Sequence, residues 1–156
     1  MPNFEPKFAV KTLDQVSPGA MVIYDHAVAF AGINRSAPAP QQLVTLTVYD
    51  AANKKFSYRY FDSTQPTVLV PTGDSILRPK LDTFAVDVGI EPVSDQLFIA
   101  EESYIVVQLP LAANQYRLLS LNTGSLVTAR FSQMNGFTSW EAGVMSLGAF
   151  VPLLKI

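Results

Sequence analysis

The feature that most constrains this chain is the close spacing of residues that interrupt helices. Eleven prolines and eight glycines divide the 156 residues into short stretches. Proline lacks a backbone donor and glycine loses entropy in a helix, so little room remains for long helices. The stretches between them are rich in Val, Ile, Leu, Phe, Tyr and Thr, which suit the pleated surface of a strand. This spacing predicts an all-β protein.

About ten short strands, separated by turns roughly every eight to twelve residues, are typical of a β-sandwich or β-barrel. We expect a single β-rich domain over residues 1–156, with antiparallel strands and a short extended segment at the N-terminus. At most one short helix is expected, a helical turn within 94–102 that Ser94 would cap. Strands are expected at 7–12, 20–24, 27–33, 43–50, 55–62, 67–71, 83–89, 103–110, 116–121 and 125–131. The tail, 137–156, mixes strand signals with Gly and Pro.

The segment 20–33 contains eleven apolar residues in fourteen and shows no clean alternation. A half-exposed strand alternates, so this pattern indicates that both faces are covered. We expect one face to meet the protein's own core and the other to meet a neighbouring chain. In the second expected hairpin, 43–62, partial alternation places Val44, Leu46 and Val48 on one side and Thr45 and Thr47 on the other.

His26 is the only histidine, and it follows Asp25 between two apolar runs. An Asp-His pair can orient an imidazole as a general base for a nearby hydroxyl. However, the pair lies where the first hairpin must turn, and the chain has no G-x-S-x-G motif. The sequence therefore favours a turn, and we expect no enzymatic activity.

Metal and cofactor sites are not expected. The chain has no cysteine and one histidine, too few ligands for a zinc site. Asp82 with Asp87, and Glu101 with Glu102, are interpreted as solvated acids rather than a calcium site. The turn at 71–75 lacks the lysine and the helix that a phosphate-binding loop needs.

One segment, 53–61, combines bases and aromatics as single-stranded nucleic-acid sites do. In a strand, however, Phe56, Tyr58 and Tyr60 share one face and Lys55, Arg59 and Phe61 share the other, while Lys54 precedes them. A core strand with a basic outer face explains this equally well, and the net charge is −2. Nucleic-acid binding is not expected.

Trp140 lies in "MNGFTSWEAG", a mix of aromatic and amide side chains that suits a carbohydrate platform, although a lone Trp is more often a core anchor. Together with Tyr58 and Tyr60 it is a candidate contact for a ligand or partner. These three residues carry the alternative function of a small β-barrel that binds a glycan, a peptide or single-stranded nucleic acid.

The charges are distributed unevenly along the chain. Residues 1–102 hold 20 of the 24 charged residues, and residues 103–156 hold only Arg117, Arg130, Glu141 and Lys155. The C-terminal part either lies inside the fold or packs against other subunits, because interface cores are depleted of charge. We favour the interface, with four neutral residues as candidate contacts: Gln108, Ser120, Thr128 and Ser132.

The expected function is that of a structural subunit in a large assembly, with copies of itself or capsid or tail proteins as partners. Low charge, a β-rich pattern and no cysteine favour a virus or bacteriophage particle, as a capsid decoration, minor capsid or tail protein. The N-terminus lacks the layout of a signal peptide, and the apolar stretches 19–33 and 143–154 are too short or too interrupted to cross a membrane. The expected location is the virion or the cytoplasm.

Overall fold

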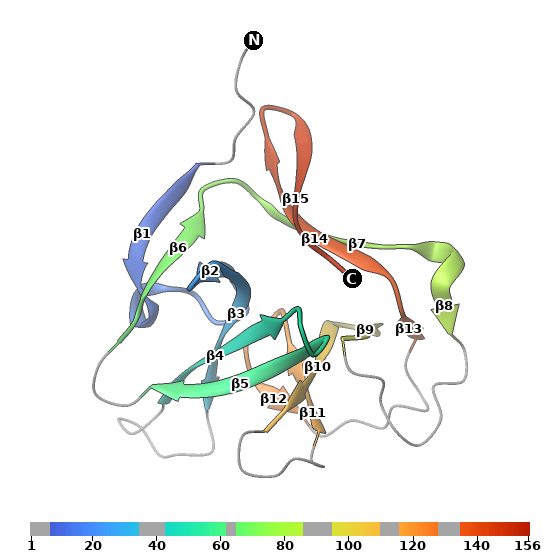
Figure 1. The fold of residues 1–156 in the computed structure, drawn as a ribbon, viewed down its shortest axis with the longest axis horizontal. Helices are drawn as coiled ribbons and strands as arrows, with labels where there is room; N and C mark the ends of the chain where they lie inside the picture. The colour runs from blue at the N-terminus through green and yellow to red at the C-terminus, as the bar shows by residue number, and fades with distance from the viewer. Residues whose placement is uncertain (1–6, 35–42, 62–64, 86–94, 110–115, 128–134) are drawn as a thin grey trace.

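A computed structural model describes residues 7–34, 43–61, 65–85, 95–109, 116–127 and 135–156. These residues form an all-β fold of two sheets with no closed barrel, joined by short 3-10 turns (Figure 1). The elements are β1 (Phe8–Thr12), η1 (Leu13–Gln15), β2 (Met21–Tyr24), β3 (Ala27–Asn34), β4 (Leu43–Asp50), β5 (Lys55–Phe61), β6 (Thr67–Pro71), β7 (Ser75–Pro79), η2 (Leu81–Thr83), β8 (Phe84–Ala85), β9 (Leu97–Ile99), β10 (Ser103–Gln108), β11 (Tyr116–Ser120), β12 (Leu126–Val127), β13 (Asn135–Phe137), β14 (Trp140–Ser146) and β15 (Ala149–Lys155).

Twelve strands form the long sheet, in the order β1-β6-β2-β3-β4-β5-β10-β9-β13-β8, with β11 and β12 attached beyond β10. The short sheet has the order β15-β14-β7. The pairs are antiparallel as predicted, with one exception: β5 and β10 run parallel, and Val107 lies opposite Phe56. Parallel neighbours need a long connection, and here residues 62–102 intervene between the two strands.

Both predicted hairpins are confirmed. β2 pairs with β3, with Met21 opposite Phe30, and β4 pairs with β5, with Val48 opposite Ser57. At the tip of the first hairpin, Asp25 and His26 both have positive φ, 47° and 64°. This is the backbone that a two-residue hairpin turn requires.

The two sheets pack face to face over the main core. We call the side of the long sheet that meets the short sheet its inner face. Its buried side chains include Met21, Phe30, Phe56, Ile105 and Leu119, and they pack against Trp140, Ala142, Val144 and Leu154 of the short sheet. The Phe56 and Trp140 rings stack across the two layers at 6.1 Å between centroids.

The opposite side of β2, β3 and β4 is also buried, which the lack of alternation in 20–33 predicted for β2 and β3. Val22, Ala29, Leu46 and Val48 form a second cluster there, with Val68 of β6 and Leu13 of η1. Thr45 and Thr47 are buried on the other side of β4. The expectation that a neighbouring chain covers one face of 20–33 is wrong for Met21 and Val22, because residues of the same chain cover both.

Two expectations about local structure are also wrong. The segment 94–102 holds no helical turn among its described residues, because Leu97–Ile99 is strand β9 and pairs with both β10 and β13. Strand β7 (Ser75–Pro79) was not expected, since Thr72, Gly73 and Asp74 signal a turn. The residues that follow this turn form an edge strand because they pair with β14.

Burial within the chain accounts for the low charge of β10 and β11. Ile105, Val107 and Leu119 face the main core, whereas Val106 and Leu118 join Phe98 in a third cluster on the opposite side. A strand that is buried on both faces has no outward phase in which to carry charge.

Candidate functional site: the uncovered end of the inner face

The first predicted site residues lie in an exposed turn. Asp25 and His26 are both solvent-exposed at the β2–β3 tip, and neither makes a hydrogen bond to another described residue. The described residues include no group of three or more His, Asp or Glu side chains that could hold a metal ion.

Of the three candidate aromatic contacts, only Tyr60 is accessible, at 43% exposure. Trp140 is buried, and its Nε1 donates a hydrogen bond to the Asp95 carbonyl oxygen at 2.8 Å. Tyr58 is buried too, with its ring edge-on to Tyr60 at 5.0 Å between centroids. The structure therefore places two of the three in the core, where they cannot serve as a binding platform.

The basic segment follows the same pattern. Phe56 and Tyr58 face the core, and Lys54 lies in the β4–β5 turn with a φ of 51°. Arg59 points to the opposite side of the strand, where its guanidinium lies 5.9 Å from the centroid of the Tyr24 ring. Phe56 and Tyr58 therefore lie on the opposite face from Arg59 and Phe61, as the alternation predicted.

A cluster of buried hydroxyls lies on β4 and β5. Thr45, Thr47 and Tyr58 are fully buried, and none of their hydroxyls makes a well-aligned hydrogen bond with another described residue. Burial raises the pKa of Tyr58 to about 12, and the nearby Thr45 hydroxyl offsets part of that rise. A buried hydroxyl without a hydrogen-bond partner lowers the free energy of unfolding, so this cluster destabilises the core.

The four candidate interface residues are not equivalent. Ser120 is fully buried inside the chain, where its hydroxyl donates to Glu102 Oε2 at 2.6 Å. Gln108 is partly buried at the end of β10. Thr128 and Ser132 lie outside the described residues. A contact with another chain through the Ser120 side chain is not available in this fold.

The inner face of the long sheet continues past the short sheet toward β1. Ile23 on β2 lies opposite Leu69 on β6, and Leu69 lies opposite Val10 on β1, so these three side chains point to the same face. Phe8 lies two residues before Val10 on β1 and shares that face. Figure 1 shows β1 and β6 at the left, beyond the three strands of the short sheet. Because neighbouring strands lie about 4.8 Å apart, three strands are much narrower than twelve and leave part of this face exposed.

Phe8, Val10 and Leu69 form what we call the uncovered end. Val10 is 69% exposed, Leu69 is 38% exposed and Phe8 is 36% exposed. The opposite phase of β6 is buried, since Val68 packs in the second cluster. A solvated face normally carries polar side chains, so three large apolar residues here make this part of the sheet the candidate contact surface.

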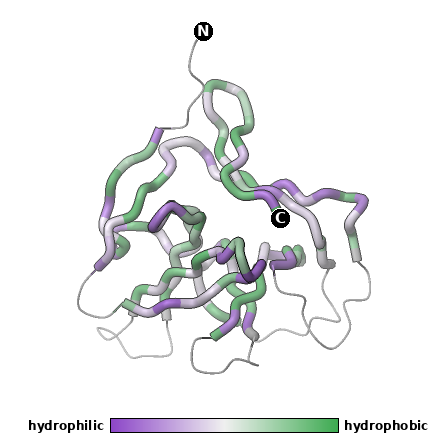
Figure 2. Tube along the Cα trace, viewed as in Figure 1, coloured by the Kyte–Doolittle hydropathy of each residue, from purple (hydrophilic) through white to green (hydrophobic). Residues whose placement is uncertain are grey.

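The β14–β15 hairpin presents another exposed apolar residue, apart from the uncovered end. Leu147 at its tip is 76% exposed and has a φ of 51°, a conformation in which Asn, Asp or Gly is preferred. The hairpin projects from the body of the molecule, and Figure 2 shows that hydrophobic residues continue to its tip. An apolar residue at a position that favours Asn, Asp or Gly makes this tip a second candidate contact.

Sequence reasoning recognised the strands that carry Phe8, Val10 and Leu69 but did not single out these residues. Alternation along 67–71 separates Leu69 from Val68 and Val70, yet it does not say which phase is covered. For Leu147, an informative signal was present: Leu-Gly occupies a two-residue turn where Asn-Gly is usual.

The described residues contain no helix long and apolar enough to span a bilayer. No protein-family model matches the chain, and no curated protein matches it. Among solved structures, eukaryotic translation initiation factor 5A from Methanococcus jannaschii is similar at a TM-score of 0.30, with 10% identity over 97% of this chain and 99% of its own. A similarity that weak carries no argument about fold or function. What the structure defines is an all-β, two-sheet protein with an uncovered apolar face.

Proposed function

We propose that this chain is a structural subunit of a larger protein assembly and that the uncovered end packs against another protein chain. The carrying observation is that the core-forming face of the long sheet reaches solvent at Phe8, Val10 and Leu69. Burying these side chains against a partner removes apolar area from water, which is the main driving force of association.

The edge position of β1 supports the same role. β1 pairs with β6 on one side and is the last strand of the long sheet on the other. An edge strand presents unpaired backbone groups that can pair with a strand of another chain. Lys7 and Lys11 flank the apolar residues of β1, and charges at an edge oppose indiscriminate strand pairing.

Within this class, a virus or bacteriophage particle is the setting we propose, as a capsid decoration, minor capsid or tail component. The support is compositional: 15% charged residues, no cysteine and a β-rich chain. The alternative function is a module that binds a glycan, a peptide or single-stranded nucleic acid through aromatic side chains. Tyr58 and Trp140 are buried in the core, so Tyr60 alone of the three candidate residues could contact such a ligand.

The test is the mass of the purified full chain, measured by light scattering and sedimentation at micromolar concentration. We expect a defined oligomer, or a stable complex with a co-purifying protein when the chain is isolated from its native source. A monomer at every concentration, with no co-purifying protein, would contradict the proposal.

A further inference from the structure

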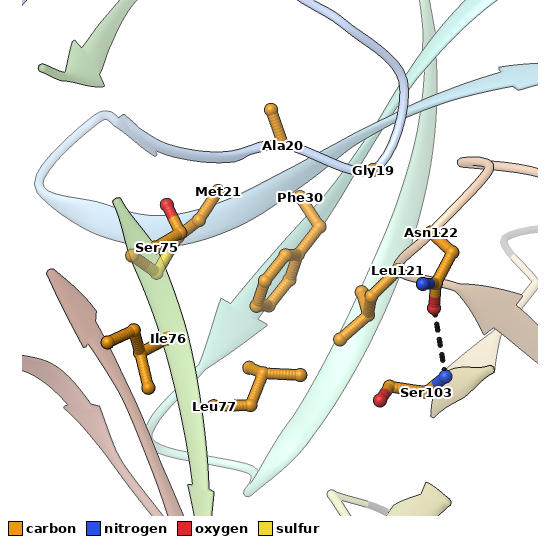
Figure 3. A pocket seen from close by; sticks show the side chains of 10 residues that line it. All are labelled: Gly19, Ala20, Met21, Phe30, Ser75, Ile76, Leu77, Ser103, Leu121 and Asn122. Carbon is orange, nitrogen blue, oxygen red and sulfur yellow. Dashed lines mark hydrogen bonds between the residues drawn. The ribbon is translucent and has the colours of Figure 1, made fainter. Parts of the chain in front are cut away.

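A cleft of about 180 Å³ lies between the two sheets. The turn before β2, strands β3 and β7, the start of β10 and the turn after β11 each supply part of its lining. Figure 3 shows Phe30, Leu77 and Leu121 converging on its centre from three different elements. These three side chains form an apolar centre that belongs to the main core, whereas Ser75 and Asn122 at the rim are exposed to solvent.

Polar groups lie at the two ends of the cleft. Ser75 lies at one end, and Ser103 and Asn122 lie at the other. Asn122 Oδ1 accepts a hydrogen bond from the Ser103 backbone N–H at 2.9 Å, which leaves Asn122 Nδ2 as a donor. The Asn122 amide NH2 group and the hydroxyls of Ser75 and Ser103 have no hydrogen-bond partner among the described residues. No charged side chain lines the cleft.

The wall of the cleft that contains Gly19 and Leu121 is held in place by contacts within the chain. The turn that contains Gly19 packs directly on the turn after β11: Gly19 has a φ of 90°, and a Cβ there would lie 2.5 Å from the Leu121 carbonyl oxygen. Gly124 makes an equally close approach to Pro18. The Gly19 N–H also donates to the Ala31 carbonyl oxygen at 2.7 Å, which ties this wall to β3. A preformed site does not have to be ordered when a ligand binds.

We propose that this cleft binds a small, neutral, single-ring molecule that carries one hydroxyl or amide group. An apolar cavity of about 150 Å³ is known to accept benzene, so 180 Å³ suits one ring with a small substituent. The absence of charge in the lining excludes an ionised ligand, because its desolvation would not be compensated. The hydroxyls of Ser75 and Ser103 and the amide NH2 group of Asn122 supply the polar contacts. This binding activity goes beyond the assembly role and does not depend on it.

The test uses phenol as the probe and the full chain as the protein. Phenol titrated against the protein should produce saturable NMR shifts of Phe30, Leu77 and Leu121, and benzoate, which is ionised at neutral pH, should produce none at equal concentration. Shifts that are absent, or that centre on the uncovered end instead, would overturn the proposal.

Leu77→Phe places a ring in the cleft and should weaken phenol binding by about tenfold or more. Leu81→Phe is the matched control, because Leu81 is exposed on η2 and lies outside the cleft lining; its affinity should stay within about twofold of wild type.

Ser103→Ala provides a second, less disruptive test, since the Ser103 hydroxyl makes no hydrogen bond within the part of the chain that the structure describes. It should weaken phenol by about threefold to tenfold and leave benzene unchanged. Phenol affinity that is unchanged in Ser103→Ala, and in Leu77→Phe if that variant folds, would exclude this site.

Discussion

Val10 on β1 is the antiparallel partner of Leu69 on β6, and the two side chains point out of the same sheet face with 69% and 38% of their surface exposed. Further along that face, Ile23 pairs with Leu69 and packs against the main core. One continuous apolar face is thus core at β2 and surface at β1. The change occurs where the short sheet ends.

The pair gives the sharpest test of the assembly role. Val10→Glu and Leu69→Glu should each leave a folded subunit, because an exposed carboxylate reaches water. Each should abolish assembly, because an unpaired charge at a buried interface is expensive. Sedimentation measures the assembly and circular dichroism the fold. Val68→Glu is the control from the opposite phase of β6, where the side chain is buried, and it should unfold the chain. Assembly that persists in both surface variants would place the interface elsewhere.

Val48→Ala should lower the free energy of unfolding by roughly 1–3 kcal/mol. Val48 is buried in the second cluster with Leu46 and Ala29, so truncation removes apolar contact and leaves a cavity. Urea denaturation followed by tryptophan fluorescence measures the change through Trp140. A midpoint that does not move would show that the side chain is not core.

Thr47→Val should raise the free energy of unfolding by about 1 kcal/mol. The Thr47 hydroxyl is buried without a partner among the described residues, so exchanging it for a methyl group removes a desolvation cost without changing shape. Thr47→Ser, which keeps the hydroxyl and loses the methyl group, should be less stable than wild type. If both variants lose stability, the hydroxyl has a partner that the described residues do not include.

His26→Val should destabilise the protein by about 1–2 kcal/mol, whereas His26→Gly should not. His26 has a φ of 64° at the second turn position, a conformation that glycine adopts freely and a β-branched residue does not. Thermal melting of the two variants gives the comparison. Equal melting temperatures would mean that the turn does not hold this conformation in solution.

Asp95→Asn should stabilise the protein at pH 7 and have less effect in acid. Burial raises the pKa of Asp95, and nearby Lys54 offsets part of that rise. A folded-state pKa above the unfolded value means that the folded chain holds the proton more tightly. The free energy of unfolding of wild type therefore falls as the pH rises through these two values and stays lower above them.

Asparagine removes that ionisation and tolerates the φ of 63° at this position. Urea denaturation of wild type and Asp95→Asn at pH 7 and at about pH 3.5, below the usual aspartate pKa, measures both arms. A stability difference that is the same at the two pH values would contradict the assignment to ionisation.

The class of fold and its most local features could be predicted from the amino-acid sequence. Spacing of Pro and Gly excluded long helices, and the apolar runs marked both hairpins, including the turn at Asp25 and His26. The lack of alternation in 20–33 correctly indicated a segment buried on both sides. These features depend on backbone preferences and on side-chain period within a few residues, so they can be read locally.

Which faces of the strands are covered could not be predicted locally, because it depends on how the two sheets pack. Nothing local distinguishes Tyr58, which is buried, from Tyr60, which shares its phase and is exposed, because the difference is how far the covering layer reaches. The same applies to Leu69, to the parallel pairing of β5 with β10, and to β7, which is a strand because β14 lies beside it. Charge was misleading for Ser120, since the low charge around it reflects burial within its own chain. Coverage is a property of non-local contacts between two sheets of unequal width, and only the folded chain shows where the narrower sheet ends.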